Sequence, residues 1–251
     1  MKMKIATYNI WSGRDYLQEG NPVCTDKIAR FIYENDIAVC GLNEVDAHCP
    51  RSGFVHEPEE IVKELERLSG NKYYWAMGVG LDGYHHEGSK YGNAVISKYP
   101  IVKTEVISIF GNFAVDPKNP KSQIQCKRER RVLLVAEIDV DGKPLTALVT
   151  HFDLYADTIR CAVDTVKARL ADVHTPAFLS GDFNVEEDES YIAELDEALV
   201  RTGKEDTTAT FHTGIKIDYI YHTHDISSEG YTVHRDVVSS DHYPVSVTIA
   251  I

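Results

Sequence analysis

The chain has 251 residues, 43% of them hydrophobic and 26% charged, as in an ordinary soluble globular protein with a substantial core. Its formal net charge of −13 disfavours tight non-specific duplex binding, unless a local basic patch or a bound divalent cation reverses the local field. The five cysteines are an odd number without a Cys-x-x-Cys pair, which argues against a disulfide framework and against a thiolate zinc site.

The chain opens with MKMKIATYNIW, which is typical of a strand that starts almost at the first residue. It contains neither the apolar stretch and cleavage site of a signal peptide nor a long apolar span. We therefore expect a reduced, cytoplasmic protein that is a monomer. No repeat, low-complexity tract or Pro/Ser-rich linker interrupts residues 1–251, so the sequence predicts one domain.

Hydrophobic periodicity and turn residues predict an alternation of strands and helices. In chain order, the expected elements are a strand at 4–10, a helix at 25–36, a strand at 37–46, a helix at 57–70, strands at 72–80 and 91–101, a hairpin at 130–153, a helix at 157–173, a strand at 175–184, a helix at 187–203, and strands at 215–222 and 241–251.

The hairpin decides the fold class. Two apolar runs flank Asp141-Gly142, a dipeptide typical of a two-residue hairpin turn. Strands that alternate with helices usually form parallel sheets, whereas a hairpin pairs strands antiparallel. The sequence therefore predicts α/β layers built on mixed sheets.

The stretch AFLSGDFNVEEDES at 177–190 has two interpretations. Gly, Asp and Asn together are typical of a turn. A buried strand that delivers Asp182 and Asn184 at its tip is also typical of a catalytic site, because a rigid strand positions the loop that follows. The stretch alone favours neither interpretation.

The same pattern recurs along the chain, because apolar strands repeatedly adjoin one polar or ionisable residue. These candidates are Asn9, Glu44, His151, Asp182, Asn184, Asp218, Asp241 and His242. Each alone is better explained as a cap, a solvent-facing group or a buried histidine with a partner. Together they point to a site, because burying so many polar groups without a task costs several kcal/mol.

These residue types indicate phosphoester chemistry. Carboxylate and amide oxygens prefer Mg²⁺ or Mn²⁺, and no His-Glu-x-x-His or cysteine set supports zinc. Histidines beside carboxylates suit a phosphate, since the carboxylate keeps the imidazolium charged. Metal, histidine and a water-orienting carboxylate fit in-line hydrolysis. Neither a Gly-x-Ser-x-Gly elbow nor a P-loop is present.

Seven motifs then resemble the endonuclease/exonuclease/phosphatase superfamily. They are TYNIW, LNEVD, YGNAVISKYPI, VTHFD, SGDFN, IDYIY and SDHYPV, in the family's order from residue 6 to 245. The family includes pancreatic-type deoxyribonucleases, abasic endonucleases, neutral sphingomyelinases and inositol polyphosphate 5-phosphatases. The resemblance implies a four-layer α/β sandwich, in which two mixed sheets pack face to face with helices on the outer faces.

The resemblance also implies a metal and substrate side of the site. Glu44 matches the principal metal-binding glutamate, and Asp241 matches a residue close to the metal. Asn9 matches an asparagine near both the metal and the scissile phosphate. Arg131 matches an arginine that faces substrate, although the basic cluster at 127–131 also fits a solvated face balanced by Glu129.

The catalytic side follows in the same way. Asp182 matches the aspartate that orients or deprotonates the attacking water, and Asn184 the asparagine that contacts phosphate. His242 matches an acid/base or phosphate ligand, and Asp218 matches its carboxylate partner. His151 matches a second histidine, typical of the nuclease and lipid-phosphodiesterase branches. Because side chains two apart on a strand share a face, we expect Asp182 and Asn184 to point the same way and Phe183 to point into the core.

Three departures separate the chain from parts of the family. Asn43 replaces the glutamine that usually precedes the metal-binding glutamate, so the support of Glu44 is expected to differ. Trp11 stands where abasic endonucleases carry an acidic ligand, which favours a single metal. A tyrosine usually replaces His151 in those enzymes. The histidine at 151 therefore argues against abasic-site repair.

The expected function is a magnesium- or manganese-dependent hydrolase of a phosphoester, a phosphodiester before a phosphomonoester. The substrate is left open among a nucleic acid, a lipid headgroup and a small molecule. The loop at 82–90, with Tyr84, His85 and His86, either shapes the substrate pocket or is a surface loop. The alternative function is a non-catalytic binding protein on the same scaffold, since a fold alone does not confer activity.

Overall fold

The computed structural model describes residues 1–84, 86–109 and 129–251. Their strands form two mixed six-stranded sheets. The first sheet has the order β11-β12-β1-β2-β4-β3, with β1 (Lys2–Asn9), β2 (Ile37–Ala47), β3 (Tyr74–Asp82), β4 (Lys90–Ser97), β11 (Ser227–Val233) and β12 (Val245–Ala250). The second has the order β5-β6-β7-β8-β10-β9, with β5 (Ile101–Ile109), β6 (Arg131–Val140), β7 (Lys143–His151), β8 (Ala177–Asp182), β9 (Val200–Arg201) and β10 (Asp218–His222).

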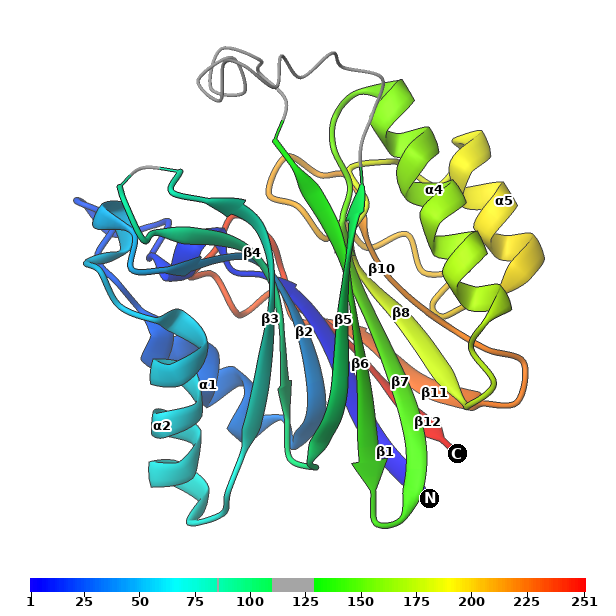
Figure 1. The fold of residues 1–251 in the computed structure, drawn as a ribbon, viewed down its shortest axis with the longest axis horizontal. Helices are drawn as coiled ribbons and strands as arrows, with labels where there is room; N and C mark the ends of the chain where they lie inside the picture. Colours follow the sequence, from blue (N-terminus) through cyan, green and yellow to red (C-terminus); the bar gives the residue numbers. More distant parts are fainter. Residues whose placement is uncertain (85, 110–128) are drawn as a thin grey trace.

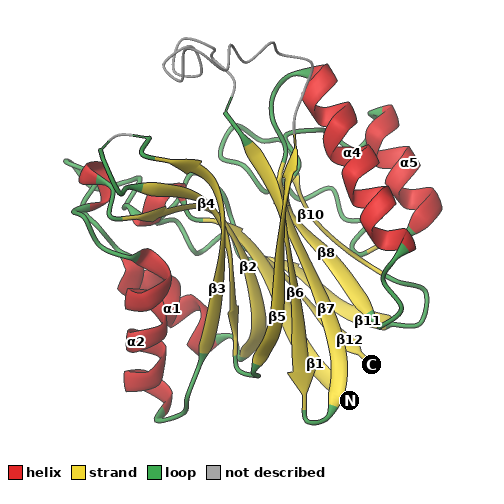
Figure 2. Ribbon diagram, viewed as in Figure 1, coloured by secondary structure: helices red, strands yellow, loops and turns green. Residues whose placement is uncertain are grey.

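Helices cover the outer faces of both sheets (Figure 1, Figure 2). Helices α1 (Thr25–Glu34) and α2 (Glu57–Ser69) pack on the first sheet, and α4 (Ala156–Ala171) and α5 (Ser190–Ala198) pack on the second. One apolar cluster fills the space between the sheets, and two others lie beneath the helix pairs. The architecture is the expected four-layer α/β sandwich. No helix within the described ranges is long and apolar enough to cross a membrane.

Local sequence explains most of these elements. Gly70 ends α2 in the left-handed conformation, with φ of 70°, where a residue without Cβ is favoured. Asp141 and Gly142 have φ of 52° and 86°, as the predicted two-residue turn between β6 and β7 requires.

The sequence predictions were wrong at several boundaries. The expected helix at 187–203 ends at Ala198, and the chain continues as the short strand β9. The expected strand at 91–101 is two strands, because β4 ends at Ser97 before Pro100 and β5 begins at Ile101. Strand β11 was missed, since its residues are exposed or half-buried and lack a strong apolar alternation.

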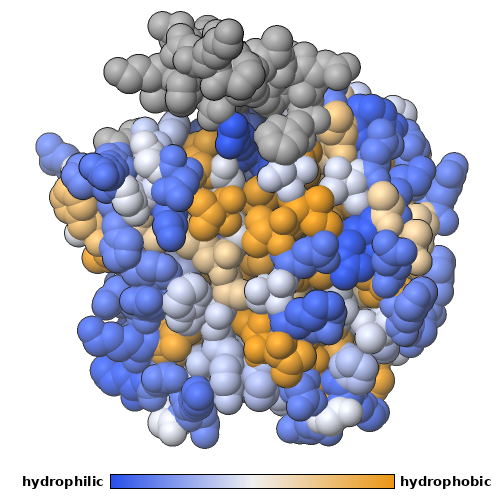
Figure 3. Space-filling model, viewed as in Figure 1, coloured by the Kyte–Doolittle hydropathy of each residue, from blue (hydrophilic) through white to orange (hydrophobic). Residues whose placement is uncertain are grey.

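The two edge strands β3 and β5 lie next to each other on one side of the sandwich. Figure 3 shows apolar surface in the middle of this face. Strand β5 exposes two large apolar side chains, Val102 and Val106. Between the two sheets, Gly41 of β2 faces Ser180 of β8. A Cβ atom on Gly41 would lie 2.6 Å from the Ser180 hydroxyl oxygen, so the glycine allows the sheets to approach closely.

Candidate active site

The predicted site residues come together at the ends of strands from both sheets. Asn9 ends β1, His151 ends β7 and Asp182 ends β8. Within the second sheet, Asp182 pairs laterally with His151 on one side and with Asp218, the first residue of β10, on the other. The segment before β12 supplies His242. Parallel pairing of β7 with β8, and of β1 with β2, brings the carboxyl ends of these strands to one edge.

The Asp182 carboxylate is the centre of this cluster and is 1% exposed. Its Oδ2 accepts a hydrogen bond of 3.0 Å from Asn9 Nδ2 and lies 3.3 Å from His151 Nε2 and 3.5 Å from His242 Nε2. Its Oδ1 accepts the backbone N–H of Asn184 at 2.9 Å. Although burial opposes the charge, His242 and His151 hold the pKa of Asp182 well below its usual range. The carboxylate is therefore ionised and is a weak base.

His242 forms a buried ion pair with Asp218. Its Nδ1 donates to Asp218 Oδ2 at 2.9 Å, and the two side chains are 5% and 1% exposed as residues. Burial opposes the imidazolium, yet the carboxylates of Asp218 and Asp182 raise the pKa of His242 to about 10. His242 therefore carries a proton on Nε2 at neutral pH and directs it toward Asp182.

His151 has a different environment from the one expected. Arg131 Nη1 lies 2.8 Å from His151 Nδ1, and because arginine can only donate, Nδ1 is the acceptor of this hydrogen bond. His151 thus lies between a carboxylate and a guanidinium, because Asp182 Oδ2 is 3.3 Å from its other nitrogen, Nε2. Arg131 itself is 9% exposed and also pairs with Glu129 at 3.2 Å. A solvated face is thus excluded for Arg131, which contacts a site histidine.

Asn184 reaches the cluster by a route that the sequence did not predict. Strand β8 ends at Asp182, and Asn184 lies beyond it with φ of 51°, so the two residues do not share a strand face. The left-handed turn brings Asn184 Nδ2 to 3.1 Å from His151 Nε2 and 2.9 Å from the Phe152 carbonyl oxygen. Phe183 does point into the core as expected, stacked on Phe152 with a ring separation of 4.6 Å.

Glu44 is placed by an irregularity in β2. The pairing of β2 with β4 shifts register between Leu42 and Val45, and Glu44 has φ of 55°. This bulge turns the glutamate out of the ladder, where it is half-buried and accepts from Asn9 Nδ2 at 3.2 Å. A non-glycine residue in this conformation is strained, and such strain is commonly found at functional sites.

Glu44 and Asp241 form a pair of unneutralised carboxylates. Burial, and then the nearby charge of Glu44, raise the pKa of Asp241 against the opposing effect of His242. Within the described part of the chain, neither carboxylate forms an ion pair with a lysine, arginine or histidine. Two half-buried oxygen donors of like charge fit a hard divalent cation.

Asn9 is less suited to ligate a metal than to contact phosphate. The backbone N–H of Trp11 donates to Asn9 Oδ1 at 3.1 Å, which fixes the amide so that Nδ2 points to Glu44 and Asp182. An amide NH₂ cannot coordinate a cation, but it donates well to an anionic oxygen. A second possible metal-binding group consists of Asp182, Asp218 and His242, whose ligand atoms all lie within 4.8 Å of one another. In that group, both carboxylates already pair with the imidazolium of His242.

Sequence reasoning missed most of the contacts that support the cluster, since it connected Asn43 only with Glu44. Asn43, which is fully buried, accepts from the Asp182 backbone N–H at 3.0 Å and donates to the Thr150 carbonyl oxygen at 2.8 Å, so it joins the two sheets. It also donates to Asn93, which in turn donates to Val132. Ser240 donates to the Asn9 carbonyl oxygen at 2.7 Å. The signal for Asn93 was a polar residue within the apolar stretch YGNAVIS; Ser240 had none beyond its neighbours.

The loop at 82–90 lies beside the segment that follows β2. Arg51 binds Asp46 through two hydrogen bonds, of 2.7 and 2.8 Å, and its guanidinium lies over the rings of Tyr84 and Tyr91. The His86 ring lies 5.8 Å from that of Phe54. His85 of this loop, and Lys127 and Arg128 of the basic cluster, lie outside the described residues.

Comparisons with known proteins identify the family and the fold. The family model described as Endonuclease/Exonuclease/phosphatase family matches residues 6–242. A solved endonuclease/exonuclease/phosphatase from Beutenbergia cavernae shares 21% identity with a TM-score of 0.79, over 100% of this chain and 72% of that one. A mannosyl-6-phosphatase from Bacteroides thetaiotaomicron shares 17% identity with a TM-score of 0.73, over 99% and 100% of the two chains.

The human Nocturnin catalytic domain, solved with a bound sulfate anion, shares 14% identity with a TM-score of 0.68, over 99% of this chain and 94% of that one. At such identities the likeness to solved structures shows a common fold. No curated protein matches the sequence significantly. The family match spans almost all of the chain. It includes all seven motifs except residues 243–245 at the end of SDHYPV. The chain therefore belongs to the endonuclease/exonuclease/phosphatase family.

Proposed function

We propose that the protein is a divalent-metal-dependent phosphoester hydrolase that acts by in-line attack of water, with phosphodiesters as its first expected substrates. One observation carries the proposal. Three nitrogens, from Asn9, His151 and His242, lie within 3.0–3.5 Å of a single oxygen of Asp182. Donors that converge on one buried anionic oxygen are also suited to converge on the oxygens of a phosphoryl group beside it.

The residues take complementary roles in this mechanism. The ionised Asp182 accepts a hydrogen bond from the attacking water and orients it, since its lowered pKa makes it a poor base. Asn9 and His151 donate to phosphoryl oxygens. His242, whose pKa of about 10 keeps it protonated, stabilises developing charge and supplies a proton to the departing oxygen. Asp218 holds the imidazole of His242 in the required orientation.

Glu44 and Asp241 would hold the cation, because they are the two carboxylates of the cluster without an ion-pair partner among the described residues. Oxygen donors favour magnesium or manganese over softer metals. Such an ion, when bound, polarises a phosphoryl oxygen and offsets the charge that develops during the reaction. The bulge in β2 positions Glu44, one ligand of the cation, independently of the regular hydrogen bonding of that strand.

The test is hydrolysis of a substrate panel with Mg²⁺, with Mn²⁺ and with a chelator. The panel comprises bis-p-nitrophenyl phosphate, p-nitrophenyl phosphate, plasmid DNA, abasic duplex, sphingomyelin and inositol phosphates. We expect metal-dependent turnover of at least one diester and none with chelator. Metal binding without turnover of any of these substrates would favour the non-catalytic binding protein instead.

A further inference from the structure

A series of aromatic rings adjoins His242 and leads away from the catalytic cluster. The Phe211 ring lies 4.6 Å from that of His242 and 4.4 Å from that of His212. The His212 ring lies 5.3 Å from Tyr16, and Tyr16 lies 5.2 Å from Trp11. We call Trp11, Tyr16, Phe211 and His212 the aromatic arc. Its residues come from two segments, 11–16 and 211–212, which are far apart in the sequence.

Backbone hydrogen bonds fix the aromatic arc to the site residues themselves. Trp11 N–H donates to Asn9 Oδ1 at 3.1 Å, and His212 N–H donates to the Asp241 carbonyl oxygen at 2.9 Å. Phe211 forms an isolated antiparallel bridge with His242. Tyr16 N–H donates to the Ser239 carbonyl oxygen at 2.8 Å. The rings are thus held at a fixed position relative to the proposed phosphate site.

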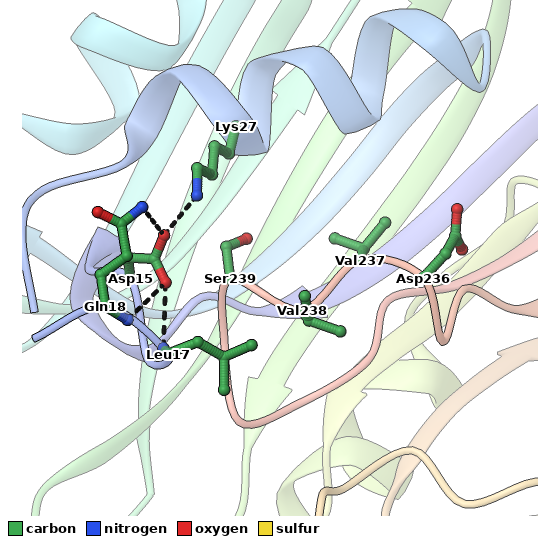
Figure 4. Close-up of a pocket in the computed structure, with 8 residues that line it drawn as sticks. All are labelled: Asp15, Leu17, Gln18, Lys27, Asp236, Val237, Val238 and Ser239. Carbon is green, nitrogen blue, oxygen red and sulfur yellow. Dashed lines mark hydrogen bonds and ion pairs between the residues drawn. The ribbon is translucent and has the colours of Figure 1, made fainter.

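The loop that carries Tyr16 is held in place by the buried carboxylate of Asp15 (Figure 4). Asp15 Oδ1 accepts the backbone N–H groups of Leu17 at 3.0 Å and Gln18 at 3.2 Å. Asp15 Oδ2 accepts from Gln18 Nε2 at 2.9 Å and from Lys27 of α1. These groups and Ser239 line a cavity of about 340 Å³ behind the loop. The internal bonds satisfy Asp15, so its role is to hold Tyr16 in place.

The arc presents ring surface more than hydrogen-bonding groups. Trp11, Tyr16 and Phe211 are half-buried and His212 is exposed. The Tyr16 hydroxyl and His212 Nε2 already face each other at 3.4 Å, and Ser239 Oγ lies 3.1 Å from the Tyr8 hydroxyl. The Arg14 guanidinium lies 4.2 Å from the centre of the Trp11 ring and adds positive charge at that end.

We propose that the aromatic arc binds a planar ring carried by the substrate, so that the preferred substrates are phosphoesters of the kind found in nucleotides; this inference rests on the proposed function of the adjoining site. A phosphate seated at Asn9, His151 and His242 brings its substituent alongside Phe211 and the rings that follow. Base–aromatic stacking tolerates different bases, because every base offers a π-face.

A sugar phosphate is the less favoured occupant. A hexose is recognised mainly through hydrogen bonds to its hydroxyl groups, whereas the Tyr16 hydroxyl and His212 Nε2 of the arc already face each other. A planar ring needs only apolar contact there, and the adjoining Arg14 suits an anionic ligand.

The test compares two ligands that differ only by a ring. Adenosine 5′-monophosphate and ribose 5-phosphate are titrated by calorimetry and as inhibitors of bis-p-nitrophenyl phosphate hydrolysis. A stacked ring is worth about five- to 100-fold in affinity. We expect the nucleotide to bind at least about tenfold more tightly, and Trp11→Leu and Tyr16→Leu each to reduce this ratio severalfold.

Tyr33→Leu is the matched control, because Tyr33 is 43% exposed on α1 and belongs to neither the cluster nor the arc. It should leave the ratio unchanged. Equal affinity of the wild type for the two ligands would overturn the inference without any variant, as would a ratio that both arc variants leave intact. Because calorimetry needs no turnover, the ligand ratio still tests the arc if the protein hydrolyses none of the esters, an outcome that would instead contradict the proposed function.

Discussion

The candidate site has two halves that differ in how their charges are balanced. In the closed half, Asp182 and Asp218 are at most 1% exposed, and both carboxylates lie within 3.5 Å of a nitrogen of His242, which is 5% exposed. In the open half, Glu44 and Asp241 are half-buried carboxylates without an ion-pair partner in the described ranges. The closed half is therefore preorganised by the protein alone, whereas the open half needs a cation to offset its charge.

The largest expected effect comes from the closed half. Asp182→Asn keeps the side-chain shape but removes the charge that faces two histidines and the attacking water. We expect kcat to fall by about 10³-fold or more, since positioned acid–base groups contribute about 10²–10⁴-fold. Added metal should restore nothing. Steady-state hydrolysis of the best diester measures this, with Asp172→Asn at the exposed end of α4 as the control.

The open half should respond differently to the matching change. Glu44→Gln removes one of two facing negative charges, so metal affinity should fall by about 10–100-fold, while excess metal restores much of the activity. Titration of activity with Mg²⁺ or Mn²⁺ gives the half-saturating concentration for the variant and for Glu34→Gln, an exposed control on α1. An unchanged half-saturating concentration would show that Glu44 does not hold the metal.

Stability should depend on the residue that joins the halves. Asn43→Ala leaves the Asp182 backbone N–H and the Thr150 carbonyl oxygen without their buried partner. Each unmet buried group costs about 1–3 kcal/mol, so we expect a loss of about 2–4 kcal/mol in the free energy of unfolding. Urea denaturation measures it against Asn71→Ala, whose side chain is exposed. A loss below about 1 kcal/mol would mean that water replaces these bonds.

The smallest effect concerns the support beneath Glu44. Glu57, which is fully buried, accepts the Asp46 backbone N–H at 2.7 Å, and burial raises its pKa well above the usual value of 4.5. Folding therefore favours the protonated acid. Its contribution to stability is complete below pH 4.5 and is lost as the pH rises through the folded-state pKa.

Glu57→Gln mimics the protonated acid and should flatten that dependence. Because the raised pKa penalises the ionised side chain only above pH 4.5, the variant should be more stable than the wild type at pH 8 and similar to it at pH 4.5. Thermal melts at the two pH values measure this. A wild type with the same stability difference from the variant at both pH values would contradict a raised pKa.

The sequence was most informative where an apolar strand meets a polar residue. Asn9, His151 and Asp182 could be placed together because each lies at the end of a strand that is buried almost throughout. The same pattern made Glu44 and Asp241 candidates, and the resemblance to a family supplied their expected role at the metal. The strand reasoning correctly placed Phe183, because period-two alternation holds as long as the core continues.

What the sequence could not predict depends on long-range geometry. The bulge at Glu44 and the left-handed turn at Asn184 break strand periodicity, and neither involves a glycine that would have signalled it. The contact of Arg131 with His151 depends on the register of β6 against β7. Strand β11 is mostly exposed, so tertiary pairing with β12 rather than local pattern decides its conformation.

Because Gly41 has no side chain, it determines how closely the two sheets approach each other beside the candidate active site. A single methyl group there would lie 2.6 Å from the Ser180 hydroxyl oxygen and 3.0 Å from Val149, so it would force the sheets apart. Asn9 and Glu44 belong to strands of the first sheet, whereas His151 and Asp182 belong to strands of the second. The separation of the two sheets at Gly41 therefore sets the distance between the site residues of the first sheet and those of the second.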